Sequence, residues 1–247
     1  MLSAVAFGEH YADGAIRFRE QLVAADTVES VESILRDVMS SQREPLGLLP
    51  GQPCEIVAKQ LAELKTYVRY VRGVNLVENG RLYCSSALGP MNVPLSAYIS
   101  TAQRDLTISL IRGTPYQPAI PALPVFRSTG HGTGLLYVIE APYVADILAH
   151  GLRYGAGKVT LSVSGSGAID EHSVFSAAGV AAAPRSGTQV RSSGFPLSVT
   201  VTASPAFASK MRWKYGAICC GTGVLLTLLI AAAYLLAFAP RRLLLSA

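Results

Sequence analysis

A β-hairpin is encoded by the stretch Val71-Arg-Gly-Val-Asn-Leu-Val-Glu-Asn-Gly-Arg-Leu-Tyr-Cys-Ser-Ser86. Asn79-Gly80 is the strongest short signal for a two-residue hairpin turn, because both residues tolerate the positive φ angles that this turn needs. The flanking runs 71–78 and 81–85 therefore predict two paired strands, with Cys84 on the second. The triplet Cys84-Ser85-Ser86 is the most informative part of this hairpin, because a second cysteine, Cys54, lies thirty positions upstream.

Two interpretations of Cys54 and Cys84 follow from the residues alone. A disulfide between them would close a loop of about 30 residues and contribute roughly 3–4 kcal/mol on the chain-entropy model. Such bonds persist in oxidising compartments such as the periplasm. The alternative is a pair of separate buried thiols. The other two cysteines, Cys219 and Cys220, lie in an apolar run and are expected to act as small packing groups, with palmitoylation as the lesser alternative.

The remaining patterns predict an α+β fold. Apolar residues at helical spacing predict a long N-terminal helix over 14–41, and a second helix is expected over 55–70, after a segment broken by prolines and glycines. Further strands are expected at 106–112, 134–140, 158–164 and 197–203, with a helix at 142–150. The Gly-, Ser- and Ala-rich region 165–194 is expected to be a long loop with one short strand at 189–191. This order predicts a mixed antiparallel sheet together with a long N-terminal helix.

A transmembrane helix is predicted near the C-terminus. Residues 215–238 include no Asp, Glu, Lys, Arg or His, and about 20 apolar residues suffice to cross a bilayer. Three basic residues precede this span and two follow it, so charge hardly discriminates its orientation, and the two upstream cysteines favour an extracytoplasmic domain before it. Residues 1–13 begin with a short apolar run lacking a basic flank. Either the C-terminal span alone delivers the domain across the membrane, or the start of the chain is truncated and residues 1–13 are the remnant of a first transmembrane segment, which is the alternative that we favour.

Several function classes find no support in the sequence. The net charge of +5 comes largely from residues that flank the span, and the other basic residues are scattered, so nucleic acid is not an expected partner. Neither a metal-ligand spacing among the histidines nor a cofactor motif is present, and the cluster Asp170-Glu171-His172 is a weak ligand set. The glycine-rich stretches 155–158 and 130–134 lack phosphate-loop spacing, and Ser166 lacks a nucleophile elbow. No catalytic residue is therefore predicted.

The chain resembles a known sensor family in four places. These are Cys54, the stretch from Cys84 to Gly89, the strand 134–140 with the Tyr143 helix that follows it, and the stretch Ser193-Gly-Phe-Pro-Leu197 before a final strand. Together they resemble the CSS-motif sensor domain of bacterial cyclic di-GMP phosphodiesterases, in which two membrane spans flank a periplasmic domain and a cytoplasmic EAL domain follows. The resemblance covers residues 14–240, and no EAL-type catalytic sequence is present in these 247 residues.

The resemblance implies a domain plan and a function. Residues 14–210 would form the periplasmic sensor domain, 215–238 the inner-membrane span and 239–247 a short cytoplasmic tail. Cys54 and Cys84 would form a disulfide that restrains a phosphodiesterase until it is reduced, with Ser85 and Ser86 hydrogen-bonding near it or serving as ordinary strand-end serines. Expected partners are the inner membrane, a cytoplasmic EAL domain or partner, periplasmic thiol oxidoreductases and a second copy of the chain.

Two rival functions remain open. A periplasmic small-ligand sensor of a membrane receptor would need a pocket of aromatic and charged residues, for which Tyr116, Tyr137 and Arg112 are the candidates. Its response would be independent of the thiol state. An anchored enzyme without a recognisable motif is the other rival, and none of the residues predicts its chemistry.

Overall fold

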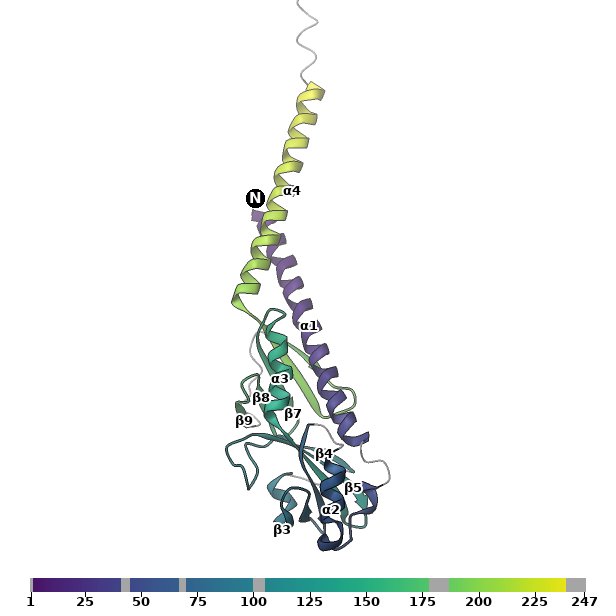
Figure 1. Ribbon diagram of the computed structural model, residues 1–247. Coiled ribbons are helices and arrows are strands. Elements are labelled where there is room, and N and C mark those ends of the chain that lie inside the picture. The colour runs from purple at the N-terminus through teal and green to yellow at the C-terminus, as the bar shows by residue number, and fades with distance from the viewer. Residues whose placement is uncertain (1, 41–44, 67–69, 100–104, 178–186, 239–247) are drawn as a thin grey trace, which may run out of the picture. The chain divides into compact units, whose positions relative to one another are not determined.

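The computed structural model describes residues 2–40, 45–66, 70–99, 105–177 and 187–238. The chain divides into two compact units, one made of residues 20–202 and one made of residues 1–19 with 203–247. The predicted fold class is confirmed: the chain is α+β, with a long N-terminal helix, antiparallel strands and an apolar C-terminal helix (Figure 1). The strands form two sheets of six and five strands, where the sequence predicted a single one.

The first sheet contains the predicted hairpin. Its order is β3-β2-β1-β6-β5-β4, and each neighbouring pair is antiparallel. The strands are β1 (Val71–Glu78), β2 (Arg81–Ser85), β3 (Gly89–Pro94), β4 (Leu106–Ile108), β5 (Ala122–Gly130) and β6 (Thr133–Glu140). Asn79 and Gly80 join β1 to β2 with φ angles of 49° and 74°, as a two-residue turn requires. The predicted strand over 106–112 is shorter, and β3 and β5 were not predicted.

The two faces of this sheet pack against different residues. On one face, Val74, Leu76 and Cys84 join the larger hydrophobic cluster together with α2 (Cys54–Lys65). On the other face, Leu82, Leu136 and Val138 join a smaller cluster with residues of η2 (Leu95–Ala97) and its C-terminal flank. The strand alternation therefore separates neighbouring residues of β1, β2 and β6 into two environments.

The second sheet lies partly in the region predicted as a loop. Its order is β10-β11-β7-β8-β9, from β7 (Ala156–Val163), β8 (Gly167–Asp170), β9 (Phe175–Ala177), β10 (Thr188–Arg191) and β11 (Leu197–Ala203). The loop prediction was wrong for the segments that form β8 and β9, because small residues here permit close strand packing. A Cβ at Gly167 would lie 2.7 Å from the Phe175 ring, so only glycine fits. The short strand predicted at 189–191 is confirmed as β10. Helix α3 (Ala141–Leu152) joins the two sheets, near its predicted bounds.

The long helix α1 (Leu2–Ser40) contributes to both units. Within residues 20–202, one face of α1 buries Val28, Leu35 and Val38 in the larger cluster. Two side-chain hydrogen bonds attach the same stretch to the second sheet: Thr188 donates to Glu20, and Ser192 donates to Glu32. The short helix η1 (Leu46–Leu48) then leads to α2, which ends at Lys65 rather than at the predicted residue 70.

The second unit pairs the start of α1 with α4 (Pro205–Phe238). Gly8 packs directly against the α4 backbone, since a Cβ at this position would lie 3.1 Å from Cα of Gly216. Arg212 and Asp13 form an ion pair at 3.6 Å. Ser204 is the single residue between β11 and α4, and its side chain accepts a hydrogen bond from the Phe207 N–H as an N-cap.

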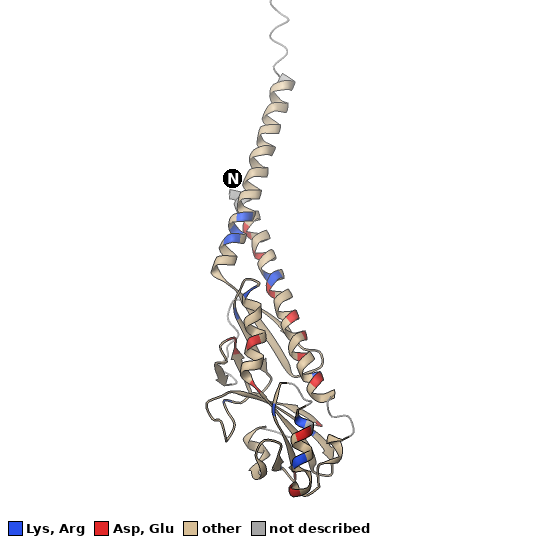
Figure 2. Ribbon diagram, viewed as in Figure 1, with Lys and Arg blue, Asp and Glu red and all other residues tan. Residues whose placement is uncertain are grey.

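Helix α4 contains the predicted span. Residues Pro205–Leu236 form the one helix in the described part of the chain that is long and apolar enough to cross a membrane, with a mean hydropathy of 2.2. Its charged residues lie near its N-terminal end, and the ribbon carries none beyond them (Figure 2). The helix begins ten residues before the predicted span, because the basic segment before residue 215 is helical too.

Candidate functional site

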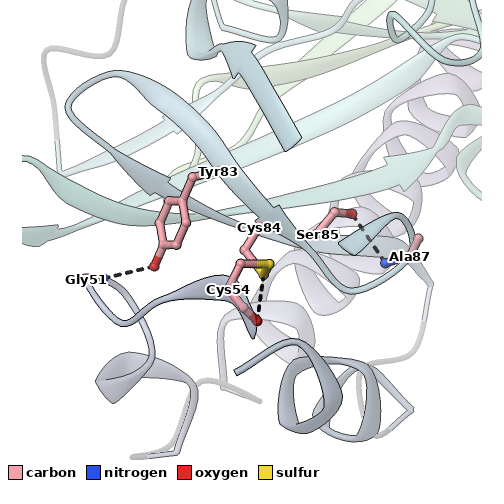
Figure 3. The surroundings of a disulfide bond; sticks show 6 residues. All are labelled: Gly51, Cys54, Tyr83, Cys84, Ser85 and Ala87. Carbon is pink, nitrogen blue, oxygen red and sulfur yellow. Dashed lines mark hydrogen bonds between the residues drawn. A yellow bond between two sulfur atoms is a disulfide. The ribbon is translucent and has the colours of Figure 1, made fainter. Parts of the chain in front are cut away.

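A disulfide joins the two cysteines that the sequence singled out. Cys54 is the first residue of α2, and Cys84 is the fourth residue of β2. Their sulfurs are 2.04 Å apart and their Cα atoms 5.3 Å apart (Figure 3). Cys54 is 5% exposed and Cys84 is 0% exposed. The bond therefore fastens the start of α2 to the predicted hairpin from inside the hydrophobic core.

A β-bulge in β2 brings a second link to the same place. Leu82 pairs with Val77 and Cys84 pairs with Leu76, so Tyr83 has no partner in β1. Such an extra residue re-aims side chains, and here Tyr83 packs against the same cluster as Cys84. The Tyr83 hydroxyl accepts a hydrogen bond from the Gly51 N–H at 3.0 Å, three residues before Cys54 (Figure 3). Sequence reasoning missed this link, because a partner 32 positions away leaves no local pattern.

Burial also affects the acidity of this phenol. Desolvation raises the pKa of Tyr83, the hydrogen bond from Gly51 lowers it by a smaller amount, and the nearby Glu78 carboxylate raises it. The net shift is upward. Tyr83 therefore stays protonated at neutral pH, so that its oxygen accepts from Gly51 as a neutral hydroxyl.

The two serines of the triplet shape the end of the hairpin. Ser86 takes the place of a strand residue beside Val74: its N–H donates to the Val74 carbonyl, and its Oγ accepts from the Val74 N–H, both at 2.9 Å. The Ser85 Oγ accepts from the Ala87 N–H at 3.3 Å and so starts the turn into β3. In the described part of the chain, the hydrogen bonds of these serines go to backbone groups and not to a sulfur.

The residues suggested for a ligand pocket do not converge. Tyr137 is 0% exposed and belongs to the larger hydrophobic cluster. Tyr116 is half exposed, and the Arg112 guanidinium lies 5.8 Å from the Phe175 ring centre. Because Tyr137 is enclosed in the core, these three side chains form no common pocket.

The cluster Asp170-Glu171-His172 is occupied in local hydrogen bonds. The Asp170 carboxylate accepts from the His172 and Val174 N–H groups, and the Glu171 carboxylate accepts from the Val159 N–H. These bonds close the turn between β8 and β9 and fix it to β7. Within the residues that the structure describes, no group of three or more His, Cys, Asp or Glu residues is placed to hold a metal ion.

The two remaining cysteines lie on α4 and are free thiols. Cys219 is half-buried and Cys220 is exposed. Each lies in the apolar stretch that could cross a membrane. A thiol surrounded by hydrocarbon behaves as a small apolar group, so this geometry is compatible with packing.

Comparison with known proteins agrees with this geometry. A family model described as "CSS motif domain associated with EAL" matches residues 19–216, which contain the disulfide and both serines. A curated Escherichia coli (strain K12) protein, "Probable cyclic di-GMP phosphodiesterase PdeD", is 28% identical over an alignment of 222 positions, and the match covers 84% of this chain. The chain spans 39% of the length of that relative. Because the family model covers most of the chain, the protein belongs to the family of CSS-motif domains associated with EAL.

Proposed function

We propose that this chain is the periplasmic, redox-responsive sensor module of a membrane-bound cyclic di-GMP phosphodiesterase. One observation carries the proposal: a buried disulfide ties the start of α2 to β2. Membership of the CSS-motif family and the phosphodiesterase name of the E. coli relative support the signalling context. The phosphodiesterase activity would belong to an EAL domain or a partner on the cytoplasmic side.

The proposed placement of the chain relative to the membrane is supported by the disulfide and by the apolar helix α4. Disulfides persist in oxidising compartments, so residues 14–210 would lie in the periplasm. Residues 215–238 would cross the inner membrane, and 239–247 would face the cytoplasm. The apolar character of α4 supports the membrane assignment. A second copy of the chain is a proposed partner, since paired membrane helices are a common way to carry a signal across a bilayer.

The proposed signal is a thiol–disulfide exchange. A dithiol of a periplasmic oxidoreductase would give two electrons and two protons to the Cys54–Cys84 bond, leaving two thiols here and a disulfide on the oxidoreductase. Because both sulfurs are buried, the exchange requires local opening at the first turn of α2. The Cys84 sulfur lies 3.9 Å from the Cys54 carbonyl oxygen, which can accept the thiol hydrogen once the bond is broken.

Reduction of the disulfide would shift the equilibrium between a closed and a locally open conformer of the α2 region. With the covalent link broken, the Tyr83–Gly51 hydrogen bond and the buried side chains of α2 would still hold this helix. The open conformer would become more populated without the domain unfolding. The segment 45–54 that would loosen begins five residues after the end of α1, so α1 is the helix nearest to it in sequence.

Thiol labelling in intact cells tests this proposal. A membrane-impermeant maleimide is applied with and without prior reduction, and the mass of each cysteine peptide is read after lysis and digestion. We expect Cys54 and Cys84 to be labelled only after reduction. Cys219 and Cys220, in the apolar helix, are the internal control and should stay unlabelled. If Cys54 and Cys84 escape labelling in reduced cells yet react after unfolding, the domain does not face the periplasm as an accessible redox sensor, and the proposal fails.

A further inference from the structure

A small cavity with both polar and apolar lining residues lies beside the CSS triplet, on the face of the first sheet opposite the disulfide. It has a volume of about 70 Å³. Its polar lining comes from β1, β2, the end of η2 and the segment after β4, and consists of Arg72, Asn75, Ser85, Tyr98, Thr114 and Tyr116. None of these residues has a role in the disulfide.

The strand alternation of β2 explains this position. Cys84 belongs to the cluster that faces α2, whereas Ser85 lines the cavity with Val138 and Tyr98, two members of the smaller cluster. Asn75 is the cross-strand partner of Ser85, so the two side chains project from the same face. The disulfide and the cavity therefore lie back to back across one layer of backbone.

The buried lining side chains have unused hydrogen-bonding capacity. Asn75, Ser85 and Thr114 are 5%, 3% and 7% exposed. Asn75 donates one amide hydrogen to the Leu136 carbonyl at 3.3 Å, and its second amide hydrogen remains available. The Ser85 and Thr114 hydroxyls accept from the Ala87 and Gln117 N–H groups, which leaves their own hydrogens to donate. Buried polar groups are normally satisfied, so this set calls for an occupant that accepts hydrogen bonds.

The positively charged side chain of Arg72 adds further hydrogen-bond donors to this set. The Arg72 guanidinium has five donors, and its ion pair with Glu140 is 3.4 Å long with both side chains partly exposed, so donors remain for a second partner. Burial is the main cause that raises the pKa of Tyr98, and this phenol therefore remains a hydrogen donor at neutral pH. Among the described residues that line the cavity, none is acidic.

We propose that this cavity binds a small carboxylate, of the size of acetate or as the terminal group of a larger ligand. A planar carboxylate matches the fork of a guanidinium, and its four lone-pair sites can take donors from Arg72, Tyr98 and Asn75. A single water needs at least about 10–15 Å³ by the same measure, so the cavity holds more than one water and accommodates a group of a few heavy atoms. This proposal does not depend on the redox proposal, because the cavity is present with the Cys54–Cys84 disulfide intact and no reduction is required for binding.

Binding of acetate to the full chain tests this site. The oxidised protein is placed in nanodiscs of deuterated lipid, and saturation-transfer NMR of the acetate methyl group gives the dissociation constant at fixed ionic strength. Acetamide is the matched neutral probe. We expect acetate to bind at least tenfold more tightly than acetamide. Arg72→Gln should weaken acetate binding at least tenfold, and Tyr98→Phe should weaken it about threefold to tenfold.

The control variant is Arg81→Gln, which removes one positive charge from β2 at a residue that does not line the cavity. It should leave the dissociation constant of acetate unchanged. Tyr98→Phe keeps the buried ring, so it remains decisive if Arg72→Gln fails to fold. The proposal is overturned if acetate shows no transfer at 100 mM, if acetamide binds equally well, or if Tyr98→Phe binds acetate as the wild type does. Binding of water alone would give the first of these results.

Discussion

Removal of the disulfide should destabilise the sensor domain without unfolding it. The perturbation is the double variant Cys54→Ala/Cys84→Ala. The sequence separation is 30 residues, and the chain-entropy relation for a loop of this length gives roughly 3.6 kcal/mol at 25 °C. For a unit of 150–250 residues, this corresponds to a fall in Tm of roughly 7–14 °C.

The contacts that remain decide whether α2 stays in place. Val57 and Leu61 are 1% and 0% exposed, and burial of each such side chain contributes about 1.5–3 kcal/mol. The Tyr83–Gly51 hydrogen bond adds about 1 kcal/mol. These terms together are at least as large as the contribution of the disulfide. We therefore expect the variant to keep its β-sheet signal and its cooperative transition.

Pulse proteolysis of the full chain in detergent, over a urea series, measures this change. Wild-type protein in reductant should lose the same free energy of unfolding as the double variant. The matched control is Cys219→Ser/Cys220→Ser, which alters the two free thiols and should leave the transition of the sensor domain unchanged. It separates the effect of the bond from any general effect of removing cysteines.

Two results would refute the reasoning in different ways. A loss below about 1 kcal/mol would mean that the unfolded chain is already constrained, so the entropy argument does not apply. A non-cooperative transition in the double variant would mean that the disulfide alone holds α2, contrary to the packing of Val57 and Leu61.

Three further outcomes are expected from the same preparation. Stability should fall as pH rises above about 10, because the unfolded chain releases the Tyr83 proton before the folded protein does, and Tyr83→Phe should flatten this fall in thermal melts. Glu20→Ala should cost about 1–3 kcal/mol in urea unfolding, because Glu20 is buried and accepts from Thr188, whereas Glu29→Ala on the exposed face of the same helix should change little. Gly8→Val should lower the melting temperature of the helical pair, because its side chain would meet the α4 backbone, and Gly14→Ala, in open space, should not.

A specific result would contradict each of these three expectations. A Tyr83→Phe protein that loses stability in alkali as steeply as wild type would remove the phenol from the explanation. Equal costs for Glu20→Ala and Glu29→Ala would mean that the hydrogen bond to Thr188 carries no stability. An unchanged melt for Gly8→Val would mean that the close approach of the two helices is not maintained in solution.

Local signals predicted the parts of the fold that are locally determined. Asn79-Gly80 predicted the β1–β2 hairpin, because the turn chemistry and the flanking strands are adjacent in sequence. The charge-free run after residue 214 predicted the apolar helix for the same reason. The strands β8 and β9 were missed, because Gly167 and its neighbours are small for packing reasons that depend on the distant ring of Phe175.

The site shows the same division between local and long-range information. The cysteines are recognisable by type, but the face on which Cys84 lies depends on the bulge at Tyr83, which places Leu82 and Cys84 in different clusters. The roles of Ser86 and Tyr83 could not be predicted, because they depend on backbone partners at Val74 and Gly51 that the fold brings near. The cavity beside Ser85 is assembled from five separate segments, so no window of the sequence contains its pattern.

The bulge at Tyr83 makes the two links from β2, the Cys54–Cys84 disulfide and the Tyr83–Gly51 hydrogen bond, independent of each other in the sequence. Relative to β1, Tyr83 is an inserted residue: Leu82 and Cys84 have consecutive partners, Val77 and Leu76. Deleting Tyr83 would therefore leave Cys84 opposite Leu76 and on the same face, while the hydroxyl contact to Gly51 and the packing of the Tyr83 ring against the larger cluster would be lost. Substitution of one cysteine removes the covalent link, and deletion of Tyr83 removes the hydrogen-bonded link. Each link can therefore be gained or lost in a single mutational event while the other remains.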